Sequence, residues 1–157
     1  MKVRIIFVCL GNICRSPSAE GIFSHIVERE GKLNDFIIDS AGLYAGHSGD
    51  RADARMRRHA LRRGYDLLSL SRGFYADADF DNFDMVIAMD NKNIKGLQAL
   101  AQNDEEKAKI YRMTDFCQKF THFNEVPDPY YGGDAGFELV LDILEDACQG
   151  LYEHLSK

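Results

Sequence analysis

The segment that most constrains the fold of this chain is an apolar run that ends in a cysteine and turns at once. The run from Lys2 to Val8 is rich in β-branched and aromatic residues, which predicts a buried central strand. Ser16 and Pro17 then predict a helix start, with the serine as N-cap and the proline in the first helical position. A strand, a short loop and a helix N-terminus in this order direct backbone N–H groups at one point. The segment therefore predicts a cradle for phosphate or a similar oxyanion.

Two chemically active side chains bound this loop. Cys9 ends the expected strand, and Arg15 lies six residues further along. The positive electrostatic potential that binds an anion here also stabilises a thiolate. We therefore expect Cys9 to be ionised at neutral pH and to act as a nucleophile. The guanidinium of Arg15 has a planar fork of donors that holds two phosphoryl oxygens and stabilises charge as it develops. The pair predicts a phosphocysteine intermediate; the alternative is a buried structural cysteine and a surface arginine.

Asp128, near the other end of the chain, is a candidate general acid and base. Phosphoryl transfer from an aryl ester requires a proton for the departing oxygen, and a carboxylic acid on a loop supplies it and later accepts one from water. Pro127 and Pro129 flank Asp128, and the second proline favours an extended conformation for it. An Asp-Pro turn is common loop chemistry by itself. Together with Cys9 and Arg15, however, Asp128 is better interpreted as the acid.

Two tyrosines, Tyr130 and Tyr131, follow this acid closely. Aromatic rings at this place predict a cleft wall that stacks on an aromatic substrate ring. The alternative is that both tyrosines are surface residues that seal the loop.

The segment from Cys9 to Pro17 resembles the phosphate-binding loop of the low molecular weight protein tyrosine phosphatases, and the segment from Asp128 to Tyr131 resembles the general-acid loop of that family. The stretches 39–42 and 88–90 are also similar, and the likeness spans essentially the whole chain. It implies a single phosphatase domain over residues 1–157 that hydrolyses phosphotyrosine in proteins, and small aryl phosphates, without a metal or another cofactor. The expected partners are phosphotyrosine-containing proteins, with phosphate or other oxyanions in the loop.

The resemblance also implies supporting roles. In the family, residues that match Asn12, Ser16 and Ser40 form a hydrogen-bond network that holds the loop, and the match to Ser16 stabilises the thiolate. Ser40 and Asp90 lie at the carboxyl ends of expected strands, so the topology of a parallel sheet also places them near Cys9. The residues expected to bind phosphate or substrate are Leu10, Gly11, Asn12, Ile13, Cys14, Ser16, Tyr130 and Tyr131.

The chain departs from the family pattern in two places. Many relatives carry a histidine in the network a few residues before an arginine, whereas Ser69 and Ser71 precede Arg72 here. We therefore expect a network that is shorter or differently built. Several relatives also place a tryptophan or another aromatic residue after the second strand; this chain has no tryptophan, so Tyr44 or His47 is expected to form that wall.

Cys14 lies close to Cys9 on the same curled loop. Peroxide converts a reactive thiolate to a sulfenic acid, and a neighbouring thiol traps that species as a disulfide. Cys14 is thus a candidate resolving thiol in a redox switch. The other interpretation, which is compatible with the first, is a small buried residue that fills the floor of the loop.

The remaining sequence alternates between strand and helix patterns, which predicts a doubly wound α/β fold. We expect an open, parallel, four-stranded sheet in one domain, with helices on both faces and the phosphate-binding loop after the first strand. The later strands are expected at 36–41, 84–89 and 110–113, and the helices at 17–30, 50–63 and 91–101. A last helix is predicted by apolar residues at helical spacing, namely Phe137, Val140, Leu141, Leu144, Ala147, Cys148, Leu151 and Leu155.

The net charge of −6 argues against general binding to nucleic acid or to an anionic membrane. Arginines are nevertheless concentrated between Arg51 and Arg72, ahead of an acidic stretch from Asp77 to Asp84. We interpret the arginines as a solvated helix face that is balanced by the acidic stretch. A docking patch for acidic partners is the lesser alternative.

The cysteine and histidine content bears on compartment and metal binding. Four cysteines without a dense framework fit a reducing compartment, and the first apolar stretch is too short for a signal peptide or a membrane span. We therefore expect a cytoplasmic protein. The five histidines are scattered, so we expect no metal site.

Three other functions deserve comparison. Protein-arginine phosphatases resemble the same loop but have a threonine in place of Ile13, and isoleucine favours the tyrosine class. Thioredoxin-coupled arsenate reductases need further cysteines in the helix after the third strand, and residues 90–96 contain none. A redox-regulated phosphate-binding module without catalysis would need neither a nucleophile nor an acid.

Overall fold

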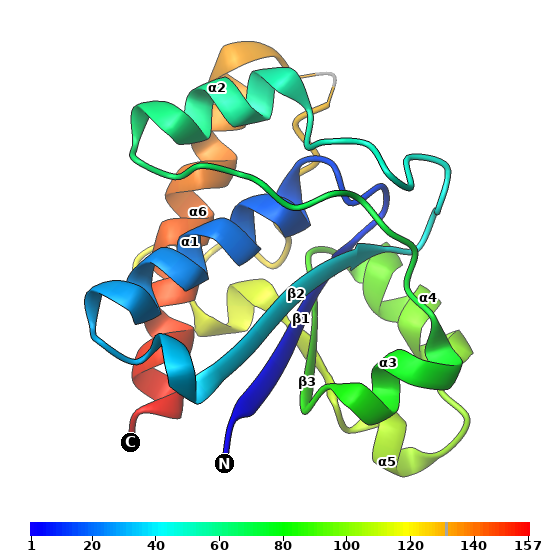
Figure 1. The fold of residues 1–157 in the computed structure, drawn as a ribbon. Helices are drawn as coiled ribbons and strands as arrows, with labels where there is room; N and C mark the ends of the chain where they lie inside the picture. Colours follow the sequence, from blue (N-terminus) through cyan, green and yellow to red (C-terminus); the bar gives the residue numbers. More distant parts are fainter. Residues whose placement is uncertain (131) are drawn as a thin grey trace.

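The computed structural model describes residues 1–130 and 132–157, which fold around one parallel β-sheet (Figure 1). The strand order is β2-β1-β3-β4, and every neighbouring pair is parallel. The strands are β1 (Val3–Cys9), β2 (Phe36–Gly42), β3 (Met85–Ala88) and β4 (Ile110–Arg112). The expected α/β class and open four-stranded parallel sheet are confirmed.

In the part of the chain that the structure describes, six α-helices and two 3₁₀ turns connect and cover these strands. The helices are α1 (Arg15–Arg29), α2 (Ala54–Arg62), α3 (Ala76–Asn82), α4 (Asn91–Leu100), α5 (Asp104–Lys107) and α6 (Gly133–Leu155), and the 3₁₀ turns are η1 (Leu33–Asp35) and η2 (Met113–Phe116). The sequence did not predict α3 or α5, because both are short, rich in acidic residues and without a repeating apolar face.

The side chains of β1 alternate between the two faces of the sheet, as the period of a strand requires. Ile5 and Phe7 join the core formed with α1 and α6, whereas Ile6 and Val8 join the core formed with α3 and α4. In Figure 1 these two pairs of helices lie on opposite sides of the strands. Helices on both faces are therefore confirmed, and β1 is buried on both sides.

Two predicted helix starts are wrong. Helix α1 begins at Arg15, so Ser16 is not its N-cap and Pro17 is not its first residue. The hydroxyl of Ser16 instead contacts the sulfur of Cys9, while Pro17 remains in the first turn, where a missing N–H is tolerated. Helix α2 begins at residue 54 rather than 50, because the carboxylate of Asp53 accepts the N–H groups of its first turn.

The strand order places the switch in chain direction between β1 and β3. The chain passes from β1 to β2 on one side, and then crosses back to β3 on the other side of β1. In open parallel sheets, ligands bind at the carboxyl ends of strands beside such a switch. Cys9, Ser40 and Asp90 lie at or next to the carboxyl ends of β1, β2 and β3, so the fold brings all three to one edge.

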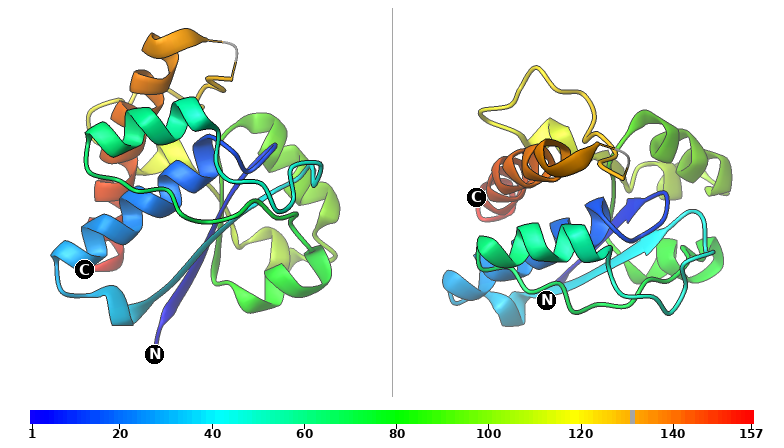
Figure 2. Two further views of the ribbon diagram at one scale, coloured as in Figure 1. Left: turned by 45° about the horizontal axis from the view of Figure 1, so that its top comes forward. Right: turned by 90° about the horizontal axis from the view of Figure 1, so that it is seen from above.

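Two arginines of the arginine-rich segment pair with carboxylates on other elements. Arg63 pairs with Glu138, Asp142 and Glu145 of α6, which lies beside α2 in both views of Figure 2. Arg72 pairs with Asp39 and Asp79. Among these contacts, the acidic stretch from Asp77 to Asp84 contributes Asp79, whereas α6 contributes three carboxylates to Arg63. In the part of the chain that the structure describes, no helix is both long enough and apolar enough to span a membrane.

The long segment between η2 and α6 is held by the carboxylate of Asp146. This carboxylate accepts three successive backbone N–H groups, from Gln118, Lys119 and Phe120, at 2.8–3.2 Å. Burial by itself would raise the pKa of Asp146, but these backbone hydrogen bonds outweigh it and hold the pKa below its ordinary value. Asp146 therefore fixes the start of the segment that leads to Asp128.

We expect Asp146→Ala to lower the free energy of unfolding by about 2 kcal/mol at pH 7, because three N–H groups lose their acceptor. Since folding lowers the carboxyl pKa, this contribution is complete above about pH 5 and is lost as the pH falls below about 4. Urea unfolding at pH 7 and pH 3.5 measures both effects. Glu153→Ala, at an exposed position of the same helix, is the control. A difference from wild type that is equal at both pH values would contradict the assignment.

Candidate active site

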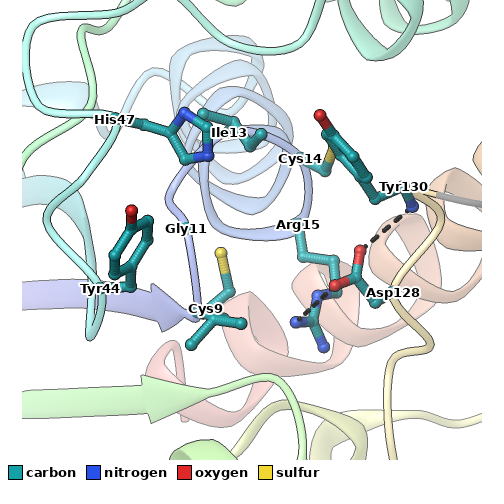
Figure 3. A pocket seen from close by; sticks show the side chains of 10 residues that line it. Cys9, Gly11, Ile13, Cys14, Arg15, Tyr44, His47, Asp128 and Tyr130 are labelled. Atoms are coloured by element: carbon teal, nitrogen blue, oxygen red, sulfur yellow. Dashed lines mark hydrogen bonds and ion pairs between the residues drawn. The ribbon is translucent and has the colours of Figure 1, made fainter.

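Cys9 lies at the carboxyl end of β1 with its sulfur pointing into the loop that follows (Figure 3). The residue is only 3% exposed. Its Sγ lies 3.0 Å from the hydroxyl oxygen of Ser16 and accepts the backbone N–H of Asn12 at 3.3 Å. The sulfur is therefore surrounded by hydrogen-bond donors, and negative charge on it is stabilised.

Asn12 gives the loop its curvature. Its φ of 56° is the one positive value among the non-glycine residues that the structure describes. Asparagine tolerates this left-handed conformation better than most residues, but the conformation still requires support. The support comes from the side chain: Nδ2 donates to Ser16 at 2.7 Å and to Ser40 at 3.0 Å, and Oδ1 accepts the N–H of Arg72 at 3.0 Å. The hydroxyl of Ser71 also donates to the Asn12 carbonyl.

The polarity of these bonds fixes the proton of Ser16. The Ser16 oxygen accepts from the Asn12 amide, and a Cys9 thiolate can only accept, so the hydroxyl proton of Ser16 points at Cys9 Sγ when Cys9 is ionised. Ser40 is placed in the same way, since it accepts from Asn12 and donates to Glu20 Oε1 at 2.6 Å. The structure thus brings together the three residues that the resemblance assigned to the network.

The network is differently built, as the missing histidine suggested. Ser71 bonds to the loop backbone, whereas Ser69 bonds to Glu20. Sequence reasoning missed Glu20, because a single glutamate in a helical pattern indicates a solvated face. The available signal was its spacing: Glu20 lies four residues after Ser16 and so shares one face of α1 with it.

Arg15 is buried beside the loop and is held by oxygen atoms. Its Nη1 donates to Asp90 Oδ2 at 2.7 Å and to the carbonyl of Val126 at 3.0 Å, while Nη2 lies 3.7 Å from Asp128 Oδ2. Burial by itself would lower the pKa of Arg15, but the negative charges of Cys9, Asp90 and Asp128 outweigh it and raise the pKa. The guanidinium therefore remains a permanent cation in a site that is only 3% exposed.

Asp90 and Val126 define the geometry around this arginine. Asp90 is the N-cap of α4, and its second carboxylate oxygen accepts the N–H of Asn93 at 2.7 Å. Val126 donates its own N–H to the carbonyl of Met89 at the end of β3, at 2.8 Å. The segment before Asp128 is therefore attached both to the sheet and to Arg15.

Asp128 is the exposed member of the group. About half of its side chain, 49%, is accessible to solvent, and its Oδ1 accepts the N–H of Tyr130 at 3.1 Å. Asp128 and Arg15 lie together on one side of the Cys9 sulfur (Figure 3). Tyr131, the second expected wall residue, lies outside the described residues.

A pocket of about 270 Å³ opens above the sulfur. Tyr44 and His47 together form one wall, with their ring centres 6.0 Å apart in an edge-to-face arrangement. The sequence predicts that either residue forms this wall, and the structure places both there. Tyr130 lies on the other side, where the guanidinium of Arg55 lies 5.1 Å from the centre of its ring. The lining residues are Cys9, Leu10, Gly11, Ile13, Cys14, Arg15, Tyr44, His47, Asp128 and Tyr130.

Cys14 lines this pocket as a buried free thiol. Burial raises the pKa of this thiol, so it is neutral at physiological pH. All four cysteines are free. The position agrees with a small residue on the floor of the loop, and the disulfide switch with Cys9 stays a prediction.

The comparisons with known proteins agree with this geometry. The family model described as "Low molecular weight phosphotyrosine protein phosphatase" matches residues 4–157. The chain belongs to this family. It is 43% identical over 155 residues to a Synechocystis protein named for the family, covering 99% of this chain and 98% of that one. It is therefore a protein-tyrosine phosphatase, a phosphoric monoester hydrolase.

Solved structures of phosphatases superpose over nearly the whole chain. A protein tyrosine phosphatase from Entamoeba histolytica, solved with Hepes in the active site, gives a TM-score of 0.94 at 45% identity and covers 99% of this chain and 97% of its own. A Drosophila arginine phosphatase gives a TM-score of 0.90 at 31% identity, with 100% and 99% covered. The fold therefore accommodates both phosphatase classes, and the lining of the pocket must distinguish them.

Gly42, the last residue of β2, allows the loop its close approach to the sheet. A Cβ atom at this position would lie 2.8 Å from the carbonyl oxygen of Leu10 and 3.0 Å from the backbone nitrogen of Asn12. Both are backbone atoms of the phosphate-binding loop, so they have no flexible side chain to move aside.

We expect Gly42→Ala to lower kcat/KM for an aryl phosphate by about tenfold or more, because the loop must shift away from its position beside Cys9. Steady-state kinetics measures the effect. Gly136→Ala is the control, since a Cβ there meets no atom closer than 3.7 Å. Equal kinetics for the two variants would show that the close approach at Gly42 does not control the loop.

Proposed function

We propose that this phosphatase hydrolyses phosphotyrosine in proteins with Cys9 as nucleophile, Arg15 as phosphate ligand and Asp128 as general acid and base. One observation carries the proposal: two segments that are distant in sequence, the loop from Cys9 to Arg15 and the segment that holds Asp128, place a thiol, a buried guanidinium and an exposed carboxyl group in the lining of one pocket. A binding module would need only the cation and the loop N–H groups.

In the first step, the Cys9 thiolate attacks phosphorus while the ester oxygen of tyrosine departs. An S–P bond forms, the P–O bond to the aryl group breaks, and the Asp128 carboxylic acid gives its proton to the departing oxygen. Arg15 and the loop N–H groups hold the other phosphoryl oxygens. Arg15 is already fixed by Asp90 and Val126, so its orientation is set before substrate binds.

In the second step, water releases phosphate. The Asp128 carboxylate accepts a proton from water, the water oxygen forms a bond to phosphorus, and the S–P bond breaks to return the Cys9 thiolate. The Ser16 hydroxyl, 3.0 Å from the sulfur, supports this step because it donates to the sulfur as negative charge returns.

The pocket favours an aromatic substrate over phosphoarginine. Tyr44, His47 and Tyr130 offer ring faces and edges, and Ile13 contributes carbon atoms alone to the lining. A guanidinium substrate would instead favour a hydrogen-bonding side chain at the position of Ile13, which has none. Phosphoarginine remains the second candidate, because the Drosophila arginine phosphatase has the same fold.

A cytoplasmic location completes the proposal. The mechanism needs a reduced Cys9, and a reducing compartment maintains free thiols. The free state of all four cysteines supports this location. In such a setting the substrates are phosphoproteins whose phosphotyrosine reaches the pocket.

The test of the reaction class compares matched phosphotyrosine and phosphoarginine peptides in metal-free buffer. We expect release of phosphate from the phosphotyrosine peptide to exceed that from the phosphoarginine peptide at least tenfold, and to disappear in Cys9→Ser. Preference for phosphoarginine would overturn the assignment of Ile13 and the aromatic walls. Release that persists in Cys9→Ser would overturn the mechanism.

A second test addresses Asp128. We expect Asp128→Ala to slow hydrolysis of phenyl phosphate by about 10²–10³-fold, because its leaving group needs a proton, and to slow p-nitrophenyl phosphate much less. The ratio of the two kcat/KM losses is the measurement. Asp81→Ala, an exposed carboxylate on α3, is the control. Equal losses for the two substrates would exclude Asp128 as the acid.

A further inference from the structure

Glu20 has a place in the fold that the reaction steps do not use. It lies one turn beyond Ser16 on α1, and its Oε1 accepts the Ser40 hydroxyl proton at 2.6 Å. Ser69 bonds to the same carboxyl group. Glu20 also lines a second cavity, of about 310 Å³, that shares no lining residue with the substrate pocket.

A continuous chain of hydrogen bonds leads from Glu20 to the nucleophile. Glu20 accepts from Ser40, Ser40 accepts from Asn12, Asn12 donates to Ser16, and Ser16 lies 3.0 Å from the Cys9 sulfur. The intermediate members are all buried: Ser40, Asn12 and Ser16 are at most 2% exposed. Water therefore has little access to these groups and does not compete for their hydrogen bonds.

The polarity of the chain is set at both ends, by the Glu20 carboxylate, which only accepts, and by the Arg72 backbone N–H, which only donates. A carboxylate only accepts hydrogen bonds, whereas a hydroxyl and a primary amide each donate and accept. Glu20 therefore obliges Ser40 to donate towards it, which leaves the Ser40 oxygen to accept from Asn12. At the other end, the Arg72 N–H donates to Asn12 Oδ1, which directs Nδ2 towards both serines. The Ser40 oxygen can receive Nδ2 because Glu20 accepts the Ser40 proton.

We propose that Glu20 is a positioning residue whose carboxylate directs this chain, so that the Ser16 hydroxyl donates to the Cys9 sulfur. The proposal rests on the function of Cys9 proposed above. Glu20 itself does not line the substrate pocket, so it acts through Ser40, Asn12 and Ser16 alone.

The charges around Glu20 leave its carboxyl group finely balanced. Burial raises its pKa, the Ser40 and Ser69 hydroxyls lower it, the nearby negative charge of Asp39 raises it and the positive charge of Arg72 lowers it, with a net upward shift. His25, Glu28 and Asp66 are the other titratable groups that line the same cavity, together with Tyr65.

The test replaces the carboxylate by its neutral isostere, Glu20→Gln, which keeps the shape and adds two donors. We expect kcat for p-nitrophenyl phosphate to fall about tenfold with KM changed less than twofold. The pH midpoint for alkylation of Cys9 by iodoacetamide should move up by about one unit, the effect of one lost charge-assisted hydrogen bond. Glu28→Gln, on the same helix and in the same cavity, is the matched control and should behave as wild type.

A purely structural role predicts another result. If Glu20→Gln lowers the melting temperature but leaves the alkylation midpoint and kcat unchanged, the proposal is overturned. If that variant does not fold, Ser40→Ala breaks the same chain at its next member and should move the midpoint in the same direction; an unmoved midpoint again overturns the proposal.

The measurement also separates this proposal from the function on which it depends. Alkylation of Cys9 in the wild-type protein must abolish phosphatase activity if Cys9 is the nucleophile. Activity that survives complete alkylation overturns the function of Cys9. Activity that is abolished in wild type, together with an unaltered alkylation profile in Glu20→Gln, overturns the role of Glu20 alone.

Discussion

The site depends on one asparagine in a left-handed conformation. The positive φ of Asn12 turns the backbone so that its own N–H reaches the Cys9 sulfur, and this conformation lasts only because surrounding groups hold it. Those groups come from three separate segments: Ser16 from α1, Ser40 from β2, and Ser71 with Arg72 from the strand-like stretch before α3. The nucleophile is therefore positioned by most of the domain rather than by its own loop.

This arrangement explains which parts of the site the sequence predicted. The sequence predicted the three proposed catalytic residues because each lies beside a local signal. Cys9 ends a strand, Arg15 lies at a helix start, and Asp128 lies between two prolines. Ser71 carries no such signal and Glu20 only its spacing from Ser16, since the importance of both residues arises from contacts across 20 residues or more. Ser16 shows the competition directly: the local rule for Ser-Pro predicts an N-cap, but the tertiary bonds to Cys9 and Asn12 determine where its side chain lies.

The same distinction holds for the fold. The four strands and the long helices were predicted because burial on one face leaves a period of 2 or 3.6 in the sequence, and burial on both faces of a strand leaves a continuous apolar run. Helices α3 and α5 leave none: α3 has a single buried aromatic residue, Phe80, and α5 has no buried residue. Their positions follow from the need to connect parallel strands, which is a property of the topology and not of any local window.

The two halves of the proposed mechanism differ in how firmly the structure holds them. Cys9 and Arg15 are each about 3% exposed and are fixed by several hydrogen bonds, whereas about half of the Asp128 side chain is in solvent. The chemistry requires this difference. In-line attack on phosphorus depends on the orientation of sulfur and guanidinium to a fraction of an ångström, but proton transfer requires only that the acid reach the ester oxygen and afterwards admit water. Because Val126 connects Arg15 to the segment that carries Asp128, the exposed acid still begins from a position that the phosphate ligand defines.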